Sequence, residues 1–279
     1  MALPSSGAIS MGQVDTELGY SATTQISLND TAVRSLFGIT SGAIDMNTGH
    51  GKAYNPGYSW YFPGNGNYYY INSPGNGYFD AQSAGYSSWC IEFWCYPYYT
   101  TNNQLTNLVC FGNGAAYGNG IATGWYENQF QFGQGQAPSW SSANGLGSTG
   151  SYAQGSWYHY AAVLNGGTIY MYINGVLDTS ISDNSGGSTA GGNGVILNGC
   201  WDNRGRGYGG TQCYLYNVRW SQNNSIYTGN FTPQTTPLGT VSGTRLLTCQ
   251  SSSFVDNSGN SWTLNLNGSG ITSQTSPHP

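Results

Sequence analysis

The stretch WYHYAAVLNGGTIYMYINGVLD, which begins at Trp157, constrains the fold of this chain more than any other. Along residues 157–164, one set of side chains (Trp157, His159, Ala161 and Val163) alternates with a second set (Tyr158, Tyr160, Ala162 and Leu164), as on the two faces of a β-strand. Asn165-Gly166 favours the positive-φ turn of a tight hairpin, so the chain is expected to return along residues 168–173. Asn174-Gly175 predicts a second such turn into residues 176–181. We therefore predict three consecutive antiparallel strands.

Short strands of the same kind are predicted along the rest of the chain from residue 54 onward. They are separated by Gly, Asn, Ser and Pro and lie at residues 59–62, 68–72, 89–99, 105–111, 129–132, 194–200, 212–220, 245–250 and 262–266. Almost no helix is plausible between them. Many short strands with turns between them predict an all-β fold, an antiparallel two-sheet jelly-roll sandwich.

Residues 1–52 have a different composition, with one tyrosine and no tryptophan. LNDTAVRSLFG predicts a short helix with Asn29 or Asp30 as its cap and Gly38 as its end, and MGQVDTELG is a weaker copy. Helices this short are marginal alone, and some fifty residues hardly enclose a core. We therefore expect a docking or oligomerisation module at 1–52, ordered against another surface, and a sandwich with a C-terminal tail at 53–279.

A six-residue sequence, called the hexamer below, occurs twice in this module with one difference, as SGAISM at 6–11 and SGAIDM at 41–46. Its isoleucine and methionine alternate with Ser10 or Asp45 as on a short strand, and such a strand can extend a neighbouring sheet edge. The hexamers and the apolar face of the predicted helix give the candidate attachment residues, which are Ile9, Met11, Val33, Leu36, Phe37, Ile44 and Met46. Coincidence in a biased composition is the alternative.

Composition excludes several classes of function. Only 6% of residues are charged and the formal net charge is −5, against about 25% charged residues in ordinary domains. Without a basic field, nucleic acid is not an expected partner. No apolar run is long enough for membrane insertion, and the N-terminus lacks the basic and apolar regions of a signal peptide. The six cysteines form no CxxC, so we expect buried thiols and no metal site.

Four motifs follow one another in the order of a known family: IEFWCYP at 91–97, WYHYAAV at 157–163, IYMYING at 169–175 and YLYNVRW at 214–220. In this respect the chain resembles the laminin-G-like, concanavalin A-like jelly rolls. YFPGNGNYYYI, at 61–71, is similar to the opening strand pair of that family. The resemblance implies the sandwich fold from near residue 54 to near residue 266.

A second resemblance covers the two ends of the chain. MALPSSGAISM, ISLNDTAVRSLFGI and, near the C-terminus, GTRLLTCQSSSFVDNSGNSWTLNLNG resemble virion structural proteins of tailed bacteriophages. This implies a protein assembled in the host cytoplasm and exposed on the particle exterior, as tail, fibre or capsid decoration. It also implies other virion proteins as partners and, by analogy, a homo-oligomer, with a trimer as the expectation.

Catalytic chemistry finds little support in the sequence. Glucanases on this fold gather two or three carboxylates on one strand, often as E-x-D-x-x-E. After residue 52 the only glutamates are Glu92 and Glu127, and neither has an acidic neighbour at that spacing. Glu92 has the opposite parity to its core-facing neighbours, so a structural role outside the core is expected, and His159 is expected to be a packed residue. We predict that the protein is not an enzyme.

Glycan binding fits the composition better, because sugars are bound by exposed rings, amides and hydroxyls. Three loops, ATGWYENQ, APSWSSANG and CWDNRGRGYGG, supply the candidate residues Trp125, Tyr126, Trp140, Trp201, Arg204, Arg206 and Tyr208. The alternative is that these rings cover the rim of the sandwich or a subunit contact. No cofactor is expected; calcium is the one alternative, with the dispersed Asp178, Asp183, Asp202 and Asp256 as candidate ligands.

Together these features favour a non-enzymatic component of a bacteriophage particle that displays a lectin-like sandwich and contacts host-surface polysaccharide. A carbohydrate-binding adhesin that is not part of a virion is the alternative. A glycan depolymerase is the third hypothesis, and the missing pair of acids disfavours it.

Overall fold

The computed structural model describes residues 2–18, 20–39, 42–52, 57–64, 66–72, 79, 87–99, 106–111, 121–126, 128–134, 145–183, 194–201, 207–210 and 212–274. The chain divides into two compact units, Met1–Pro56 and Gly57–Pro279. This division falls four residues after the expected end of the N-terminal module at residue 52. Each unit has its own buried residues and is described by itself.

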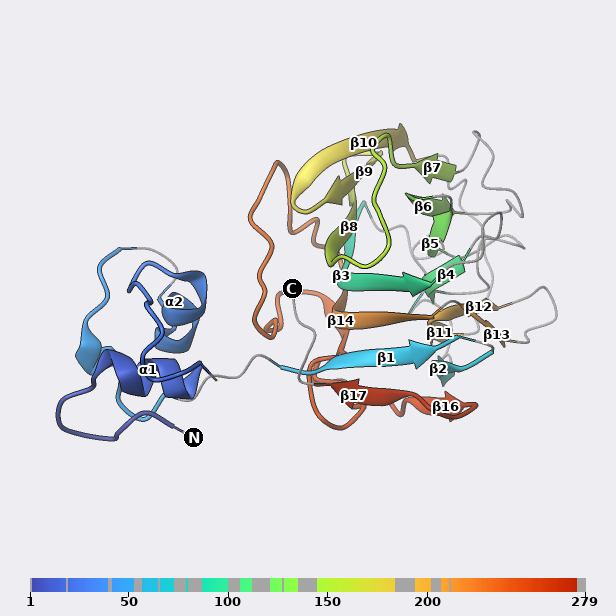
Figure 1. Ribbon diagram of the computed structural model, residues 1–279. Helices are drawn as coiled ribbons and strands as arrows, with labels where there is room; N and C mark the ends of the chain where they lie inside the picture. Colours follow the sequence, from blue (N-terminus) through green and yellow to red (C-terminus); the bar gives the residue numbers. More distant parts are fainter. Residues whose placement is uncertain are drawn as a thin grey trace. The chain divides into compact units, whose positions relative to one another are not determined.

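The larger unit consists of two antiparallel sheets (Figure 1). The eight-stranded sheet has the order β10 (Val176–Ser182), β9 (Thr168–Ile173), β8 (Tyr158–Asn165), β3 (Ser88–Tyr99), β14 (Gln212–Gln222), β1 (Ser59–Pro63) and β17 (Thr272–Gln274), with β15 (Thr244–Thr248) also paired to β14. The seven-stranded sheet has the order β16 (Asn265–Asn267), β2 (Tyr68–Asn72), β11 (Gly194–Leu197), β4 (Thr106–Phe111), β5 (Ile121–Tyr126), β6 (Gln129–Gln134) and β7 (Gly145–Gly147). A small hairpin joins β12 (Gly199–Trp201) to β13 (Gly207–Gly209).

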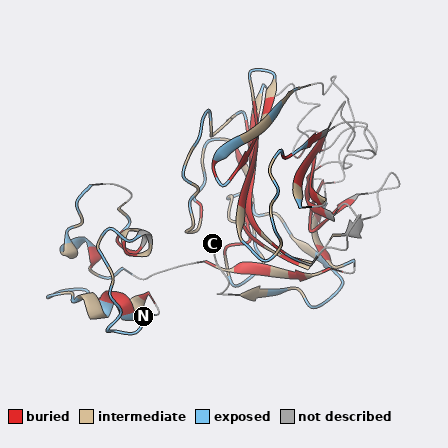
Figure 2. Ribbon diagram, turned by 45° about the horizontal axis from the view of Figure 1, so that its top comes forward, coloured by how far each residue is buried: buried red, intermediate tan, exposed pale blue. Residues whose placement is uncertain are grey.

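An aromatic core lies between the two sheets, where the buried residues of both are concentrated (Figure 2). The ring of Trp89 lies 5.5 Å from Trp220 and 5.8 Å from Phe132, and Phe111 lies 4.8 Å from Trp220. Alternate residues of each strand point into this core, which is what the period of two in the sequence predicts. The predicted all-β, two-sheet jelly-roll sandwich is confirmed.

The predicted meander is present as β8, β9 and β10. Its second turn is Asn174-Gly175 as expected, with φ of 52° and 76°. Its first turn lies one residue further on, at Gly166-Gly167, because Asn165 still pairs with Thr168. Glycine is favoured at both turn positions, since each has a positive φ. The predicted strand 194–200 is divided at Asn198, whose φ of 60° separates β11 from β12.

The N-terminal unit contains α1 (Met11–Glu17), α2 (Thr31–Phe37) and the 3-10 turn η1 (Met46–Gly49). Its buried apolar residues form a small core of their own, made of Leu3, Val14, Leu18, Val33, Leu36 and Phe37. The expectation that this segment cannot enclose a core was therefore wrong. Val33, Leu36 and Phe37 are at most 4% exposed, so their side chains fill the unit and are not an attachment surface.

The doubled hexamer does not form strands. In both copies the glycine takes a positive φ, 86° at Gly7 and 84° at Gly42. The fifth residue then caps the turn that follows: Ser10 accepts from the Gln13 amide, and Asp45 accepts from the amide of Asn47. Ile9, Ile44 and Met46 are half-buried against the unit's core, and Met11 is half-buried. The hexamer is thus a repeated helix start, and the strand interpretation was wrong.

All six cysteines are free and buried, as the sequence predicted. Burial raises the pKa of the Cys90, Cys95, Cys110, Cys213 and Cys249 thiols above their ordinary value. Within the described ranges, none of the helices has the length and apolarity that crossing a membrane would require.

Candidate functional site

The outer face of the eight-stranded sheet, which points away from the core, is covered over part of its area by residues 223–243 between β14 and β15. We call these residues the cover segment. Its backbone carbonyls accept hydrogen bonds from three outward side chains of β3 and β14. The Trp94 indole donates to Gln234 over 2.9 Å, the Tyr216 hydroxyl to Thr235 over 3.0 Å, and the Arg219 guanidinium to Gly239 over 2.8 Å.

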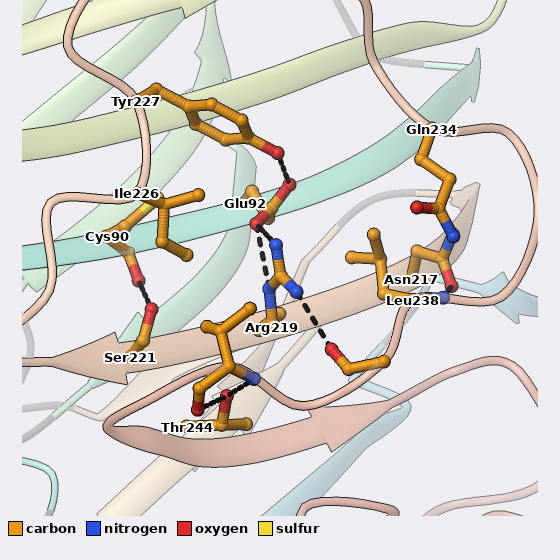
Figure 3. A network of polar contacts seen from close by, with 12 residues as sticks. Cys90, Glu92, Asn217, Arg219, Ser221, Ile226, Tyr227, Gln234, Leu238 and Thr244 are labelled. Atoms are coloured by element: carbon orange, nitrogen blue, oxygen red, sulfur yellow. Dashed lines mark hydrogen bonds and ion pairs between the residues drawn. The ribbon is translucent and has the colours of Figure 1, made fainter. Parts of the chain in front are cut away.

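A buried charge network lies beneath the cover segment (Figure 3). Glu92 of β3 is 1% exposed. Its Oε1 accepts from Nε and Nη2 of Arg219, at 2.9 and 2.5 Å, and its Oε2 accepts from the Tyr227 hydroxyl at 2.7 Å. Nε2 of His159 lies 3.3 Å from the same Oε2. Both oxygens of this carboxylate are therefore engaged by side chains of the protein.

The pKa of Glu92 is held below its ordinary value, although burial alone would raise it. The hydrogen bond and charge of His159, the charge of Arg219 and the hydrogen bond from Tyr227 outweigh burial. Burial, together with the charge of Glu92, raises the pKa of the Tyr227 hydroxyl. Glu92 thus points away from the core, as its parity predicted, but it is enclosed and ionised. Such a group ties the cover segment to the sheet and does not have the raised pKa of a general acid.

A second group of outward side chains lies on the same face at the end of β3 beyond Trp94. Tyr61 of β1 is paired with Tyr214 of β14, and Tyr214 is paired with Tyr96 of β3. Since Cys95 is paired with Tyr158, Trp157 stands opposite Tyr96. These four rings thus cross the strands, and Tyr98 extends them along β3. We call Tyr61, Tyr96, Tyr98, Trp157 and Tyr214 the aromatic patch.

The rings of the aromatic patch contact one another but do not share a plane. The centroids of Tyr61 and Tyr214 are 5.1 Å apart with an angle of 47° between the planes, and those of Tyr96 and Tyr214 are 5.8 Å apart at 87°. Tyr96 lies 5.7 Å from Trp157 at 62°. Tyr98 is 55% exposed, and the other four rings are half-buried. Burial, and then the neighbouring tyrosines, raise the pKa of the Tyr214 hydroxyl.

Of the seven candidate glycan residues, only Trp125 and Tyr126 have side chains among the described residues. Trp125 lies in β5 and is fully buried, with its ring 4.7 Å from Phe130. Its expected exposure was wrong, because residues 122–126 of ATGWYENQ belong to the core strand β5 and not to a loop. Tyr126, the next residue, is half-buried on the opposite face of β5. Trp201 and Tyr208 are on β12 and β13, but their side chains lie outside the described residues, as do Trp140, Arg204 and Arg206.

Two of the four candidate calcium ligands accept hydrogen bonds from other groups of the protein. Asp178 accepts from the Thr149 amide at 2.5 Å and the Tyr152 hydroxyl at 2.7 Å. Asp256 accepts from the Ser258 amide at 2.9 Å. Asp183 directly follows β10, and Asp202 lies outside the described residues. Within the described part of the chain, no three His, Cys, Asp or Glu residues gather as metal ligands would.

Two antiparallel sheets around an aromatic core, with a hairpin meander at one edge, define a laminin-G-like jelly roll. The chain belongs to the concanavalin A-like lectin/glucanases superfamily, since the family model of that description matches residues 63–223, which is more than half of the chain. No curated protein sequence matches this chain.

Solved structures of the same fold are distant in sequence. A candidate carbohydrate-binding protein from Bacteroides ovatus is 14% identical with a TM-score of 0.48; the match covers 78% of this chain and 60% of that protein. A heptameric SAP-like pentraxin from Limulus polyphemus is 16% identical with a TM-score of 0.48, covering 76% of this chain and 94% of the pentraxin. Domains LG4-5 of the mouse laminin alpha1 chain are 13% identical with a TM-score of 0.43, covering 63% and 46%.

Proposed function

We propose that this chain is a non-enzymatic component of a bacteriophage particle, in which the N-terminal unit attaches the protein and the sandwich binds host-surface carbohydrate. The observation that carries the binding proposal is the aromatic patch. Sugars present C–H faces that pack on aromatic rings and hydroxyls that bond to polar groups, and tyrosine offers both. Membership of a superfamily that includes lectins supports the same function.

The proposed site differs from the loops that the sequence suggested. It is built on paired strands, so the backbone ladder fixes the spacing of its rings before any ligand is present. The Gln212 amide donates to the Tyr61 hydroxyl, which holds that ring in place. A preformed site loses less conformational freedom on binding than a site on loops.

The virion part of the proposal rests on the N-terminal unit and its resemblance to bacteriophage leaders. The unit has its own core, so it can serve as a separate attachment element. With Val33, Leu36 and Phe37 buried, attachment would use the exposed side chains of the unit. Other virion proteins are the proposed partners, and a homotrimer is the proposed assembly.

Glu92 supports the proposal that the protein is not a glycan depolymerase. A glycosidase needs one acid with a raised pKa and a second carboxylate that is free to act. Glu92 is enclosed and ion-paired, with its pKa lowered. These contacts support a structural role for Glu92.

Two measurements test the proposed function with the unmodified chain. A glycan array and adsorption of the purified protein to host cells should reveal binding to surface polysaccharide. Antibody labelling of intact particles should place the protein on the exterior. An array and a host surface without any ligand would remove the binding role, and particles without label would remove the virion role in favour of an adhesin outside a virion.

A further inference from the structure

We infer that the ligand of the aromatic patch is a single, uncharged polysaccharide chain that crosses the strands of the eight-stranded sheet from Tyr61 to Trp157. This inference rests on the proposed carbohydrate binding and goes beyond it, because it fixes the class of glycan, its direction and the face of the sandwich.

The direction follows from the strand register. Tyr61, Tyr214 and Tyr96 occupy directly opposed positions on β1, β14 and β3, and Trp157, just before β8, contacts Tyr96. Neighbouring strands are about 4.8 Å apart, so three steps carry the rings about 14 Å across the sheet. A ligand that contacts all four rings is therefore elongated and runs perpendicular to the strands. A monosaccharide would cover only part of this length.

The absence of charge follows from the side chains around the rings. On the open side of the patch, the same-face positions two residues along each strand are Pro63, Gln212, Tyr98 and Gly155. On the covered side they are Ser59, Tyr216, Trp94 and His159. Among these described positions only His159 has a basic side chain, and it is 2% exposed.

The two arginines that are described in the larger unit have partners of their own. Arg219 is paired with Glu92 beneath the cover segment, and Arg245 donates to Gln222. An anionic polysaccharide would lose hydration at the patch without gaining an opposite charge from the described side chains around it, which is unfavourable. The patch therefore favours a neutral glycan.

The angles between the ring planes favour binding of a single polysaccharide chain over binding to the surface of a polysaccharide crystal. Adjacent planes differ by 47°, 87° and 62° along the row. Rings that bind a flat polysaccharide crystal would have to lie in one plane. Rings at these angles instead meet both the faces and the edges of successive sugars in one flexible chain. The tyrosine hydroxyls of the patch suit a hydroxylated ligand.

Affinity electrophoresis of the full chain tests this inference. Native gels would contain a soluble neutral polysaccharide (dextran, laminarin or galactomannan) or anionic hyaluronan, and a pull-down would use microcrystalline cellulose. We expect retardation by at least one neutral polysaccharide. Tyr98→Ala and Tyr96→Ala should each weaken it about threefold to tenfold, as expected for loss of one aromatic contact. Tyr20→Ala removes an exposed ring from the other unit and should leave retardation unchanged.

The outcomes separate this inference from the proposed function. Neutral-glycan binding that survives both substitutions would overturn the inference and leave carbohydrate binding intact. Binding to hyaluronan alone, or to microcrystalline cellulose alone, would also overturn it. A wild-type chain that binds no glycan would remove both proposals. Self-association that Tyr98→Ala abolishes would identify a second copy as the occupant. If Tyr96→Ala does not fold, Tyr98→Ala and Tyr61→Phe decide the matter.

Discussion

Glu92→Gln is the most direct perturbation of the buried network, because it removes the charge and keeps the shape of the side chain. The carboxylate accepts two hydrogen bonds from Arg219 and one from Tyr227. Hydrogen bonds to charged groups contribute about 1.5 to 3 kcal/mol each. The amide retains one acceptor oxygen but turns an NH2 group toward other donors. Arg219, 5% exposed, is left without its counter-charge.

The expected loss in free energy of unfolding is about 3 to 5 kcal/mol, the usual effect of removing one partner of a buried pair. This is a large part of a typical total of about 5 to 15 kcal/mol. With a urea dependence near the upper end of the range of about 1 to 3 kcal/mol per molar, the midpoint should fall by about 1 to 2 M. All nine tryptophans lie after residue 56, so tryptophan fluorescence at pH 7 follows the sandwich alone.

The matched control is the double variant Glu92→Leu with Arg219→Met, which removes both charges together. It should be more stable than Glu92→Gln, because no buried charge is left unpaired. A Glu92→Gln midpoint within about 0.3 M of wild type would refute the reasoning, since that shift corresponds to less than about 1 kcal/mol. Equal stability of the two variants would show that the pairing itself is unimportant.

Two further predictions follow from the same kind of contact. The pKa of Glu92 is lowered in the folded chain, so its stabilising effect is complete above the unfolded pKa of about 4.3 and is lost as pH falls through the lower folded value. The urea midpoint should therefore fall between pH 5 and pH 3 by more in wild type than in the double variant, and parallel curves would contradict this. Ser10→Ala removes the oxygen that accepts from the Gln13 amide at 3.2 Å and should weaken the start of α1 by about 1 kcal/mol. Hydrogen exchange of residues 11–17 should then be about fivefold faster, whereas unchanged exchange, as expected for Ser21→Ala, would show that the cap is dispensable.

The sequence predicted best those strands in which β-branched and aromatic residues follow one another without glycine or proline. β9 and β2 begin and end at the predicted residues. β5 was missed because its glycine and threonine weaken the pattern, although Trp125 is fully buried within it. A single strand with a small residue facing outward has little signal of its own, and only its pairing with β4 and β6 defines it.

The candidate site was harder to predict for a physical reason. The parity of Glu92 gave its direction correctly, but the cover segment that encloses it binds mainly through backbone carbonyls, as at Gln234, Thr235 and Gly239. Backbone acceptors are present at every residue and leave no pattern in the sequence. The aromatic patch is formed by register between strands far apart in the chain, which one sequence does not reveal. The hexamer had a readable signal, since Ser10 and Gln13 have the spacing of a capping box.

The six buried thiols have a practical consequence for chemical labelling. Thiol-directed reagents react with the exposed thiolate, and every native cysteine here is buried. A cysteine introduced at an exposed position such as Tyr20 or Tyr98 would therefore be the preferred site for a maleimide dye or a gold cluster under native conditions. The native cysteines should therefore give little background labelling. Each unit can be tagged at one introduced cysteine for imaging or for distance measurements between spectroscopic probes.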